Sequence, residues 1–398
     1  MYIKNKGVIV MKKILAVVLA LCFAFPFVLS AGAEETVLQF DENGEFVIMH
    51  LCDCQDGYPA SETMLAFIRN TIAKYDPDIV ILGGDNTVGP KETKALAIEE
   101  LVAPFVESET YFAVTFGNHD NEQDVDKEQL LKYYQQYGGE YCLTVDIVPE
   151  LFGVGTHNLP VLSSDGSKYA FNIWTFDSNT YHPEGGYDAV HEDQIEWYKQ
   201  TAAALAAEND GEVVPAMAFQ HIIVGEAFPA LFLPYPDALA VPDITKTVDG
   251  VTYSFTPQYD RITSGVVMEF PCPGSVNYGQ FDAFLEVGDV MATFSGHDHI
   301  NSFTVPYKGI DIINTPGATF NSYADDSSRG CRIVTINEND PENYKNELVT
   351  VYSAILEGDD EVLNGTADAS KFNAFFGKLV DMFLVIFTKA LGFIQGIA

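Results

Sequence analysis

Short apolar runs alternate along this chain with longer stretches in which apolar residues recur at helical spacing. Six of the short runs are rich in β-branched and aromatic residues, and they predict buried strands. These strands cover residues 46–51, 79–82, 111–116, 170–176, 216–219 and 290–294. Three later runs, at residues 303–307, 310–314 and 332–336, predict consecutive strands joined by turns.

Three of the longer stretches predict helices that each bury one face. Residues 61–75 place Met64, Ile68 and Ile72 on the same side, and Ser61 is suited to cap the helix at its N-terminus. Residues 91–106 and 191–207 repeat this spacing. The mixture predicts an α/β fold in which two packed mixed β-sheets are flanked by helices.

A polar cluster directly follows each of the six predicted strands. In chain order the clusters are Asp53-Cys54-Gln55, Gly84-Asp85-Asn86, Gly117-Asn118-His119-Asp120, Asp177-Ser178-Asn179, Gln220-His221 and Gly296-His297-Asp298-His299. Strands of an α/β sheet that end in such residues place them along one rim, where these folds bind ligands. Carboxylate and amide oxygens mixed with imidazoles are the donor set that a pair of divalent cations needs. The clusters therefore predict a site for two divalent metal ions, with manganese, zinc and iron as the candidates.

The order of the clusters resembles the motifs of the calcineurin-like metallophosphoesterase superfamily, which read D-x-H, GD, GNH[DE], a lone H and GHxH. The resemblance spans residues 46–337, and residues 113–120, 294–301, and 176–179 followed by 194–198 are most similar to the purple-acid-phosphatase-like branch. It implies the sandwich fold of that superfamily and hydrolysis of a phosphate ester. Two positions depart from the pattern. Gln55 stands where the superfamily has His, and Val88 stands where purple acid phosphatases carry the Tyr that gives their colour.

The resemblance also implies a role for each residue of the predicted site. Asp85 would touch both cations. The first cation would bind Asp53 and His299, with Gln55 adding its carbonyl oxygen, and the second would bind Asn118, His221 and His297. The cations would lower the pKa of a shared, metal-bridging water toward about 7, and the resulting hydroxide would attack phosphorus.

Two further residues of the third cluster would assist this reaction. His119 would protonate the leaving oxygen, and Asp120 would orient a neighbouring imidazole. Taken singly, every one of these residues also has a structural explanation, because Gly-Asp and Gly-Asn favour turns and a lone His after a strand is typical of a core. Asp177 and Asn179 would shape the substrate side of the cleft or only close a strand. The combination, in one order, favours the metal site.

The cysteines predict no disulfide framework. Five of the six lie beyond residue 33, and their number is odd and their spacing irregular. Cys52 and Cys54 flank Asp53 on a strand end, so their side chains are expected on the opposite face, buried as small apolar groups. Cys54 is therefore not counted among the metal ligands.

The N-terminal 33 residues predict a secretory signal peptide. Lys12 and Lys13 precede an apolar run at residues 14–29, and Ala31-Gly32-Ala33 is a small-residue cleavage site. We expect a secreted or extracytoplasmic protein, with the metallophosphoesterase domain at residues 34–356. Within it, residues 225–280 are rich in proline and aromatics and predict loops over the site, either as a determinant of specificity or as a surface insertion.

Residues 357–398 predict an acidic linker followed by an amphipathic helix. Asp381 and Lys389 interrupt its apolar face, which argues against a membrane-spanning helix. Two alternatives remain open for this helix: peripheral contact with a membrane surface, which would associate the protein with the cell surface, or packing against the domain.

The net charge of −36 excludes an obvious nucleic-acid partner, because such a surface repels polyanions. A phosphate-ester substrate must then be attracted locally, as two cations in the cleft would do. The leading hypothesis is a secreted dinuclear phosphohydrolase. The alternative is a surface-associated binding module on the same fold with weak or no catalysis, and Gln55 is the reason to consider it.

Overall fold

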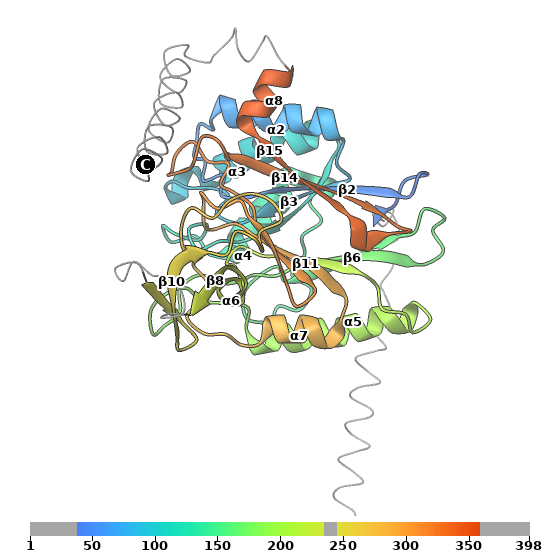
Figure 1. Ribbon diagram of the computed structural model, residues 1–398. Helices are drawn as coiled ribbons and strands as arrows, with labels where there is room; N and C mark the ends of the chain where they lie inside the picture. The colour runs from blue at the N-terminus through green and yellow to red at the C-terminus, as the bar shows by residue number, and fades with distance from the viewer. Residues whose placement is uncertain (1–37, 235–244, 359–398) are drawn as a thin grey trace, which may run out of the picture. The chain divides into compact units, whose positions relative to one another are not determined.

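The computed structural model describes residues 38–234 and 245–358 of the chain (Figure 1). The predicted signal peptide lies outside these ranges, and so does the predicted C-terminal linker and helix apart from residues 357 and 358. In the part of the chain that is described, none of the helices has the length and apolar character needed to cross a membrane.

One sheet has five strands, in the order β15 (Lys345–Thr350), β14 (Gly330–Asn337), β2 (Glu45–Leu51), β3 (Ile79–Gly83) and β4 (Tyr111–Thr115). Strands β2, β3 and β4 are parallel, with Ile48 opposite Ile79 and Ile79 opposite Tyr111. Strand β14 runs antiparallel to both of its neighbours. The parallel strands consequently end at the same edge of the sheet.

The second sheet has seven strands. Their order is β1 (Leu38–Gln39), β5 (His157–Leu162), β6 (Tyr169–Thr175), β7 (Ala216–Phe219), β11 (Val290–Ser295), β13 (Ile310–Asn314) and β12 (Thr304–Tyr307). Strands β6, β7, β11 and β13 are parallel to one another. Strand β5 is antiparallel to β6 and parallel to β1, and β12 is antiparallel to β13. Four further parallel strands therefore share one carboxyl-terminal edge.

The alternation of side chains along each strand builds two kinds of core. On β2, Phe46 and Ile48 point into a cluster shared with Phe171 and Phe219 of the other sheet. The alternate residues, such as Met49, belong to a cluster shared with the helices outside the five-stranded sheet. Because successive side chains of a strand face opposite sides, each sheet is buried on both faces.

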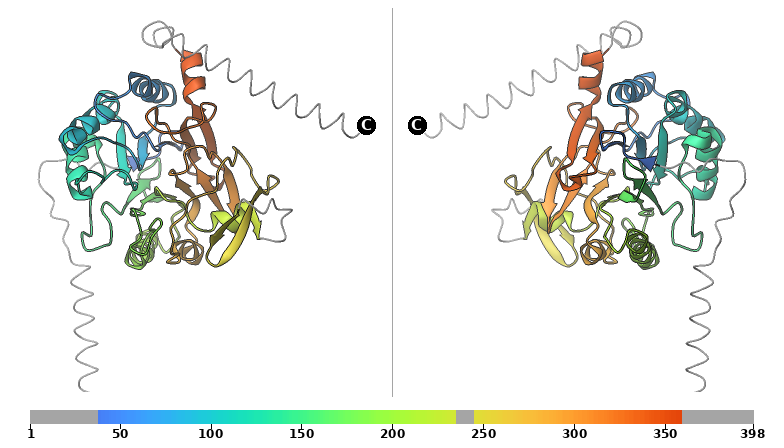
Figure 2. Two further views of the ribbon diagram at one scale, coloured as in Figure 1. Left: turned by 90° about the vertical axis from the view of Figure 1, so that its left-hand side faces the viewer. Right: turned by 90° about the vertical axis from the view of Figure 1, so that its right-hand side faces the viewer.

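Helices cover the outer faces of the two sheets (Figures 1 and 2). Helices α2 (Glu62–Tyr75), α3 (Lys91–Glu107) and α4 (Lys127–Gly138) contribute to the core on the five-stranded side. Helices α5 (Glu192–Glu208), α6 (Ala227–Leu231) and α7 (Gln280–Val287) contribute to the core on the seven-stranded side. The predicted fold, two packed mixed sheets flanked by helices, is confirmed.

The helix starts follow local sequence. Ser61 caps α2, and its hydroxyl accepts a hydrogen bond from the Met64 backbone nitrogen at 3.4 Å. At the start of α5 the Gln194 side chain accepts from the His191 backbone nitrogen at 2.8 Å. Both contacts satisfy amides that a helix N-terminus leaves without a partner. The remaining described helices are two short 3₁₀ helices, Gly139–Tyr141 and Pro341–Asn343, and helix α8 (Val351–Gly358).

Residues 225–280 differ in part from their prediction as loops, because residues 258–279 contain no helix or strand but the residues before them do. After α6 they form a small antiparallel sheet of β8 (Phe232–Pro234), β10 (Val251–Pro257) and β9 (Thr245–Val248). The aromatic residues that suggested loops instead pack together, since Phe228, Phe232 and Phe270 have ring centroids 5.2–5.8 Å apart. The segment holds its own apolar contacts, and these give it regular structure.

Candidate metal centre

The six polar clusters converge where the parallel strands of both sheets end. Backbone hydrogen bonds tie the loops to one another: the Asp53 amide donates to the Gly84 carbonyl at 3.0 Å, and the Gly296 amide donates to the His221 carbonyl at 3.1 Å. The loops after β2 and β3, and those after β7 and β11, are thereby held in pairs. The rim predicted from the sequence exists, and both sheets contribute to it.

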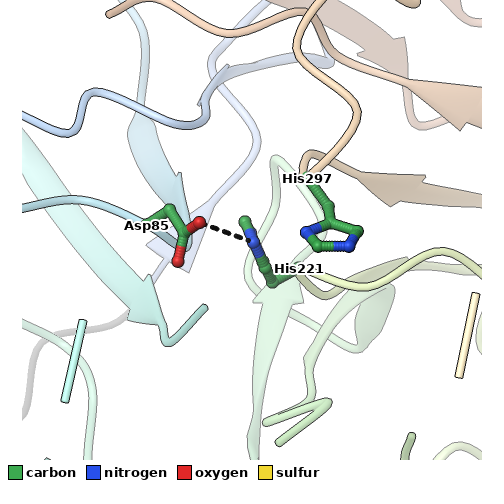
Figure 3. A group of neighbouring side chains, drawn as sticks. All are labelled: Asp85, His221 and His297. Carbon is green, nitrogen blue, oxygen red and sulfur yellow. Dashed lines mark ion pairs between the residues drawn. The ribbon is translucent and has the colours of Figure 1, made fainter. Parts of the chain in front are cut away.

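Two groups of side chains at this rim have the spacing of metal ligands. Asp85, His221 and His297 form one group, and Asp53, Asp85 and His299 form the other, with one ligand atom of each residue within 4.8 Å of the others in its group. Asp85 belongs to both groups. In Figure 3 the Asp85 carboxylate faces the His221 ring, and their Oδ2 and Nε2 atoms lie 3.3 Å apart. His299 Nε2 lies at the same distance from Asp53 Oδ1.

Several polar atoms of these groups, and one of Asn118, are buried without a hydrogen-bond partner among the described residues. They are Asp53 Oδ1, Asn118 Oδ1, His221 Nε2 and His297 Nε2. Each such atom costs free energy, typically about 1–3 kcal/mol, unless something binds to it. Four lone-pair donors that face one place, beside a shared carboxylate, suit a pair of divalent cations. The side chains present therefore fit the group that the sequence predicted.

The imidazoles are oriented for ligation through their Nε2 atoms. His221 Nδ1 lies 2.9 Å from the Gly83 carbonyl oxygen, and His299 Nδ1 lies 2.7 Å from the Tyr323 carbonyl oxygen. A backbone carbonyl accepts only from a protonated nitrogen, so each contact places the proton on Nδ1 and leaves Nε2 to bind.

Burial and charge act on these groups in opposite directions. Burial alone lowers the pKa of His221, but the negative charges of Asp85 and Asp53 raise it to about 10. Burial also lowers the pKa of His299, but the negative charge of Asp53 raises it to about 9. Burial and the charge of His221 hold the pKa of His297 well below its ordinary value. Without a cation, protons on two imidazoles balance the carboxylates, and cation binding has to displace them.

The glycines of the motifs give the ligands room. A Cβ at Gly84 would lie 2.5 Å from His221 Nδ1, and one at Gly296 would lie 2.4 Å from Asp53 Oδ2. Asp53, Asp85 and His297 themselves have positive φ angles of 50°, 50° and 71°. Such conformations are uncommon for residues with a side chain and concentrate at functional sites.

Gln55 stands beside the carboxylate that the two groups share. Its side-chain amide nitrogen donates to Asp85 Oδ2 at 3.3 Å, so its nitrogen, and not its oxygen, is turned toward the shared carboxylate. The arrangement differs from the predicted ligation through the carbonyl oxygen. The physical reason is that Asp85, which offers acceptors alone, attracts the donor end of the amide.

His119 lies next to the ligand groups in the chain, and its ring reaches the surface. The backbone amide of His119 donates to Asp85 Oδ1 at 2.7 Å. Its imidazole Nδ1 lies 2.8 Å from Glu122 Oε1, and 39% of the side chain is exposed. The ring lines a cavity of 320 Å³ together with Lys94 and Glu122. His119 is therefore accessible to a ligand at the edge of the site.

Asp120 has a different role from the predicted one. Its Oδ1 accepts from the backbone amides of Asn86 and Thr87 at 2.9 and 3.2 Å, and its Oδ2 accepts from that of Gly117 at 2.8 Å. Both carboxylate oxygens are thus taken by backbone, and Asp120 joins the loop after β3 to the loop after β4. Among the described residues no imidazole forms a hydrogen bond or ion pair with Asp120, and the backbone amides are its partners.

Asp177 and Asn179 close the end of β6. Asp177 accepts two hydrogen bonds from the buried ammonium of Lys127 at 2.7 and 2.9 Å and one from the Val154 amide at 2.8 Å. The Asn179 side chain donates to the Ala189 carbonyl at 2.7 Å. Of their two predicted roles, these contacts favour the structural one.

Cys52 and Cys54 are fully buried, as the sequence predicted. The five cysteines within the described residues are free thiols. Neither Cys52 nor Cys54 belongs to a ligand group.

Sequence reasoning missed three tyrosines that contact the ligands. The Tyr181 hydroxyl accepts from Asn118 Nδ2 at 3.1 Å, the Tyr187 ring meets the His297 ring edge-on at 4.2 Å, and the Tyr323 ring stacks on His299 at 4.3 Å. No motif marks these positions. They lie in loops after β6 and β13, and only folding brings them to the site.

Comparison with known proteins agrees with this geometry. The family described as calcineurin-like phosphoesterase matches residues 46–301, which is more than half of the chain. "Probable inactive purple acid phosphatase 14" of Arabidopsis thaliana is 27% identical over 321 residues, covering 72% of this chain and 73% of that protein. "Phosphatase DCR2" of Saccharomyces cerevisiae is 25% identical over 213 residues, covering 48% of this chain and 36% of that protein.

A solved structure of a dimetal phosphatase from Danio rerio covers 73% of this chain and 92% of its own, at 12% identity and a TM-score of 0.45. The family match coincides with the part of the chain that carries all six polar clusters. This chain therefore belongs to the calcineurin-like phosphoesterase family.

Proposed function

We propose that this protein is an exported, dinuclear metal-dependent phosphohydrolase that cleaves a phosphate ester. The observation that carries the proposal is the position of Asp85, which is shared by two ligand groups. Three further donor atoms of these groups, Asp53 Oδ1, His221 Nε2 and His297 Nε2, are buried without a hydrogen-bond partner among the described residues. A carboxylate offers two oxygens, so one side chain in this position serves two cations.

The chain supplies distinct functions around the proposed cations. The first would be held by Asp53, Asp85 and His299, and the second by Asp85, Asn118, His221 and His297. When bound, two divalent cations activate a water as nucleophile and neutralise charge on the phosphoryl oxygens. The protein fixes this donor set in advance, because the loops are tied by backbone hydrogen bonds and the imidazoles by backbone carbonyls.

His119 is the proposed proton donor to the leaving oxygen. Its backbone amide is bound to Asp85, so the residue is adjacent to the site, and 39% of its side chain is exposed. Glu122, 2.8 Å from Nδ1, is placed to hold that nitrogen protonated and to leave Nε2 for the substrate. The protein has a net charge of −36, which repels an anionic substrate, so the proposed cations would provide the main attraction for it.

The alternative function is a binding module that holds ions and phosphate without turnover. Two observations favour it. Gln55 turns its amide nitrogen toward Asp85, and three similar Arabidopsis thaliana proteins are named "probable inactive" purple acid phosphatases. Gln55 is one position, however, and the other predicted ligands are present at the rim.

The test is hydrolysis of an aryl phosphate monoester and its matching diester by protein stripped of metal and reloaded with manganese, zinc or iron. We expect metal-dependent turnover that Asp85→Asn and His297→Gln abolish. Asp282→Asn, an exposed acid in the first turn of α7, is the matched control and should turn over like the parent. The ratio of monoester to diester rates then identifies the substrate class.

Other results would distinguish the two functions. Absence of turnover in protein that binds two ions supports the binding module, and Gln55→His is then the first variant to assay for recovered activity. Absence of ion binding contradicts both. Export is tested separately, by fractionation of the producing cells and by sequencing the mature N-terminus, which the cleavage motif places after Ala33.

A further inference from the structure

A small hairpin after β6 places two tyrosines against the proposed ligands of the second cation. Tyr181 and Tyr187 face each other across an isolated antiparallel bridge, and their rings stack with centroids 5.8 Å apart. The hairpin is closed by hydrogen bonds from the His182 amide to the Gly186 carbonyl and from the Asp188 amide to the Thr180 carbonyl. The two rings are therefore held in fixed positions.

Contacts to the rest of the protein hold the hairpin in place. The Ser275 hydroxyl donates to the Gly185 carbonyl at 2.7 Å, and the Ser275 amide donates to the Tyr187 carbonyl at 2.7 Å. The Tyr187 ring meets the His297 ring at an interplanar angle of 86°. These contacts fix the hairpin against Ser275 and His297, so Tyr181 is already in position before a ligand binds.

The Tyr181 hydroxyl contacts the Asn118 side chain. It accepts from Asn118 Nδ2 at 3.1 Å, which turns Asn118 Oδ1 to the buried side where it has no hydrogen-bond partner. Asn118 is 1% exposed, whereas Tyr181 is 51% exposed. The hydroxyl of Tyr181 thus contacts a buried ligand residue, while about half of the tyrosine is exposed.

A phenol has one hydrogen to donate and also lone pairs with which to accept. At Tyr181 an acceptor position is taken by Asn118, and within residues 38–234 and 245–358 the structure shows no acceptor for the hydroxyl hydrogen. That hydrogen is consequently available for donation to a bound ligand.

His119 is assigned to the leaving oxygen, and the lysines that follow the second and third clusters are already hydrogen-bonded within the protein. Lys94 Nζ donates to the Thr87 carbonyl, and Lys127 Nζ is bound to Asp177. Lys91, the first lysine after the second cluster, is exposed, and its Nζ donates to the Asp124 carbonyl at 2.9 Å. With these three ammonium groups engaged, a neutral hydroxyl is a suitable donor to phosphoryl oxygens that face away from the cations.

We propose that Tyr181 is a catalytic residue that contacts the substrate, donating its hydroxyl hydrogen to a phosphoryl oxygen while it accepts from Asn118. The inference rests on the proposed function, since it assigns a residue to that same site. The hydrogen bond strengthens as negative charge builds on the phosphoryl oxygens in the transition state, and a donor fixed in advance costs no reorganisation.

The decisive variant is Tyr181→Phe, which removes the hydroxyl and keeps the ring that stacks on Tyr187. The matched control is Tyr259→Phe, because Tyr259 is 67% exposed in the segment that follows β10. Three quantities are measured on metal-loaded protein: the number of bound ions, the dissociation constant of inorganic phosphate by calorimetry, and kcat and KM for an aryl phosphate.

For Tyr181→Phe we expect two bound ions, phosphate binding weakened about 10-fold or more, and kcat lowered by about 10- to 100-fold, as for loss of a hydrogen bond to a charged group. Tyr259→Phe should match the parent in all three. Unchanged phosphate affinity and unchanged kcat in Tyr181→Phe would overturn the inference. Loss of an ion from that variant would also overturn it, because Tyr181 would then act only by holding Asn118.

The phosphate measurement keeps this inference distinct from the proposed function. If the parent protein shows no turnover with any metal, the hydrolase proposal fails. The role of Tyr181 is then decided by phosphate binding alone, and equal affinities of the parent and Tyr181→Phe would contradict it. If the parent turns over and the variant equals it, the hydrolase proposal stands and only the role of Tyr181 is lost.

Discussion

Gly117 lies directly against Asp85. A Cβ at Gly117 would come within 2.1 Å of Asp85 Oδ1 and within 2.5 Å of the Asp85 backbone nitrogen. The GNHD cluster thus begins with glycine because the shared carboxylate of the preceding cluster occupies the space beside it. A motif residue with no chemistry of its own determines where the central carboxylate can stand.

We expect Gly117→Ala to displace Asp85 and to disrupt both ligand groups. The overlap involves backbone as well as side chain, so the variant should lose about 1–3 kcal/mol of unfolding free energy, as for an overpacked core. Calorimetry should show ion binding weakened at both positions. Gly225→Ala is the control, since the nearest atoms to its Cβ are 3.5 and 3.7 Å away. A Gly117→Ala protein that binds ions like the parent would contradict this reading.

Cation binding should stabilise the fold through the shared carboxylate. A ligand that binds only the folded state adds about 2.7 kcal/mol to the unfolding free energy when present at 100 times its dissociation constant. We expect manganese or zinc to raise the melting temperature of metal-stripped protein and Asp85→Asn to lose this response. Asp282→Asn should keep it. An equal response in all three proteins would show that ions bind elsewhere.

The buried ion pair between Lys127 and Asp177 should be important for stability. The ammonium is 2.7 Å from Asp177 Oδ1, and the two side chains are 8% and 0% exposed. Lys127→Met leaves an uncompensated buried carboxylate and should cost about 3–5 kcal/mol of unfolding free energy. The measurement is denaturant unfolding of Lys127→Met, Asp177→Asn and the double variant.

In that cycle, the double variant should lose less than the two single variants together. The exposed pair between Arg69 and Glu107, with side chains 44% and 56% exposed, is the control. Arg69→Met should cost no more than about 1 kcal/mol. Additive losses in the Lys127 and Asp177 variants would rule out a coupled pair.

His157, at the start of β5, should make the protein sensitive to acid. Its ring is fully buried, and burial lowers its pKa to about 4 although the Gly155 carbonyl partly opposes this. Between pH 6.5 and 4 the unfolded chain therefore binds a proton that the folded chain does not. The unfolding free energy should fall as pH drops through this window, by up to about 3 kcal/mol from this residue.

The measurement is the unfolding free energy of His157→Asn and the parent at several pH values. The variant should lose less stability than the parent between pH 6.5 and 4, and His182→Asn, on the surface hairpin, should follow the parent. Parallel curves for His157→Asn and the parent would show that the imidazole is not held neutral in the folded protein.

Elements with a clear local pattern could be predicted from the sequence. Strands β7 and β13 have the predicted bounds, and α2 begins after its predicted cap, Ser61. Helix α4 was not predicted, since it is mostly polar and few of its apolar residues, Leu130, Leu131 and Tyr134, are buried in the core. The small sheet within residues 225–280 was also missed. Its strand β9 is polar and half-exposed, and pairing with β10 sets its conformation.

The sequence by itself determined the fold class, the rim and the set of donors gathered there. Each of these follows from strand periodicity and from the residues that end each strand, which are properties of a short stretch of chain. Which donor meets which partner was decided only by the tertiary structure. Asp120 binds backbone amides, Gln55 turns its nitrogen to Asp85, and Tyr181 reaches Asn118. Those contacts join loops that are far apart in sequence, and the packing of the two sheets sets their geometry.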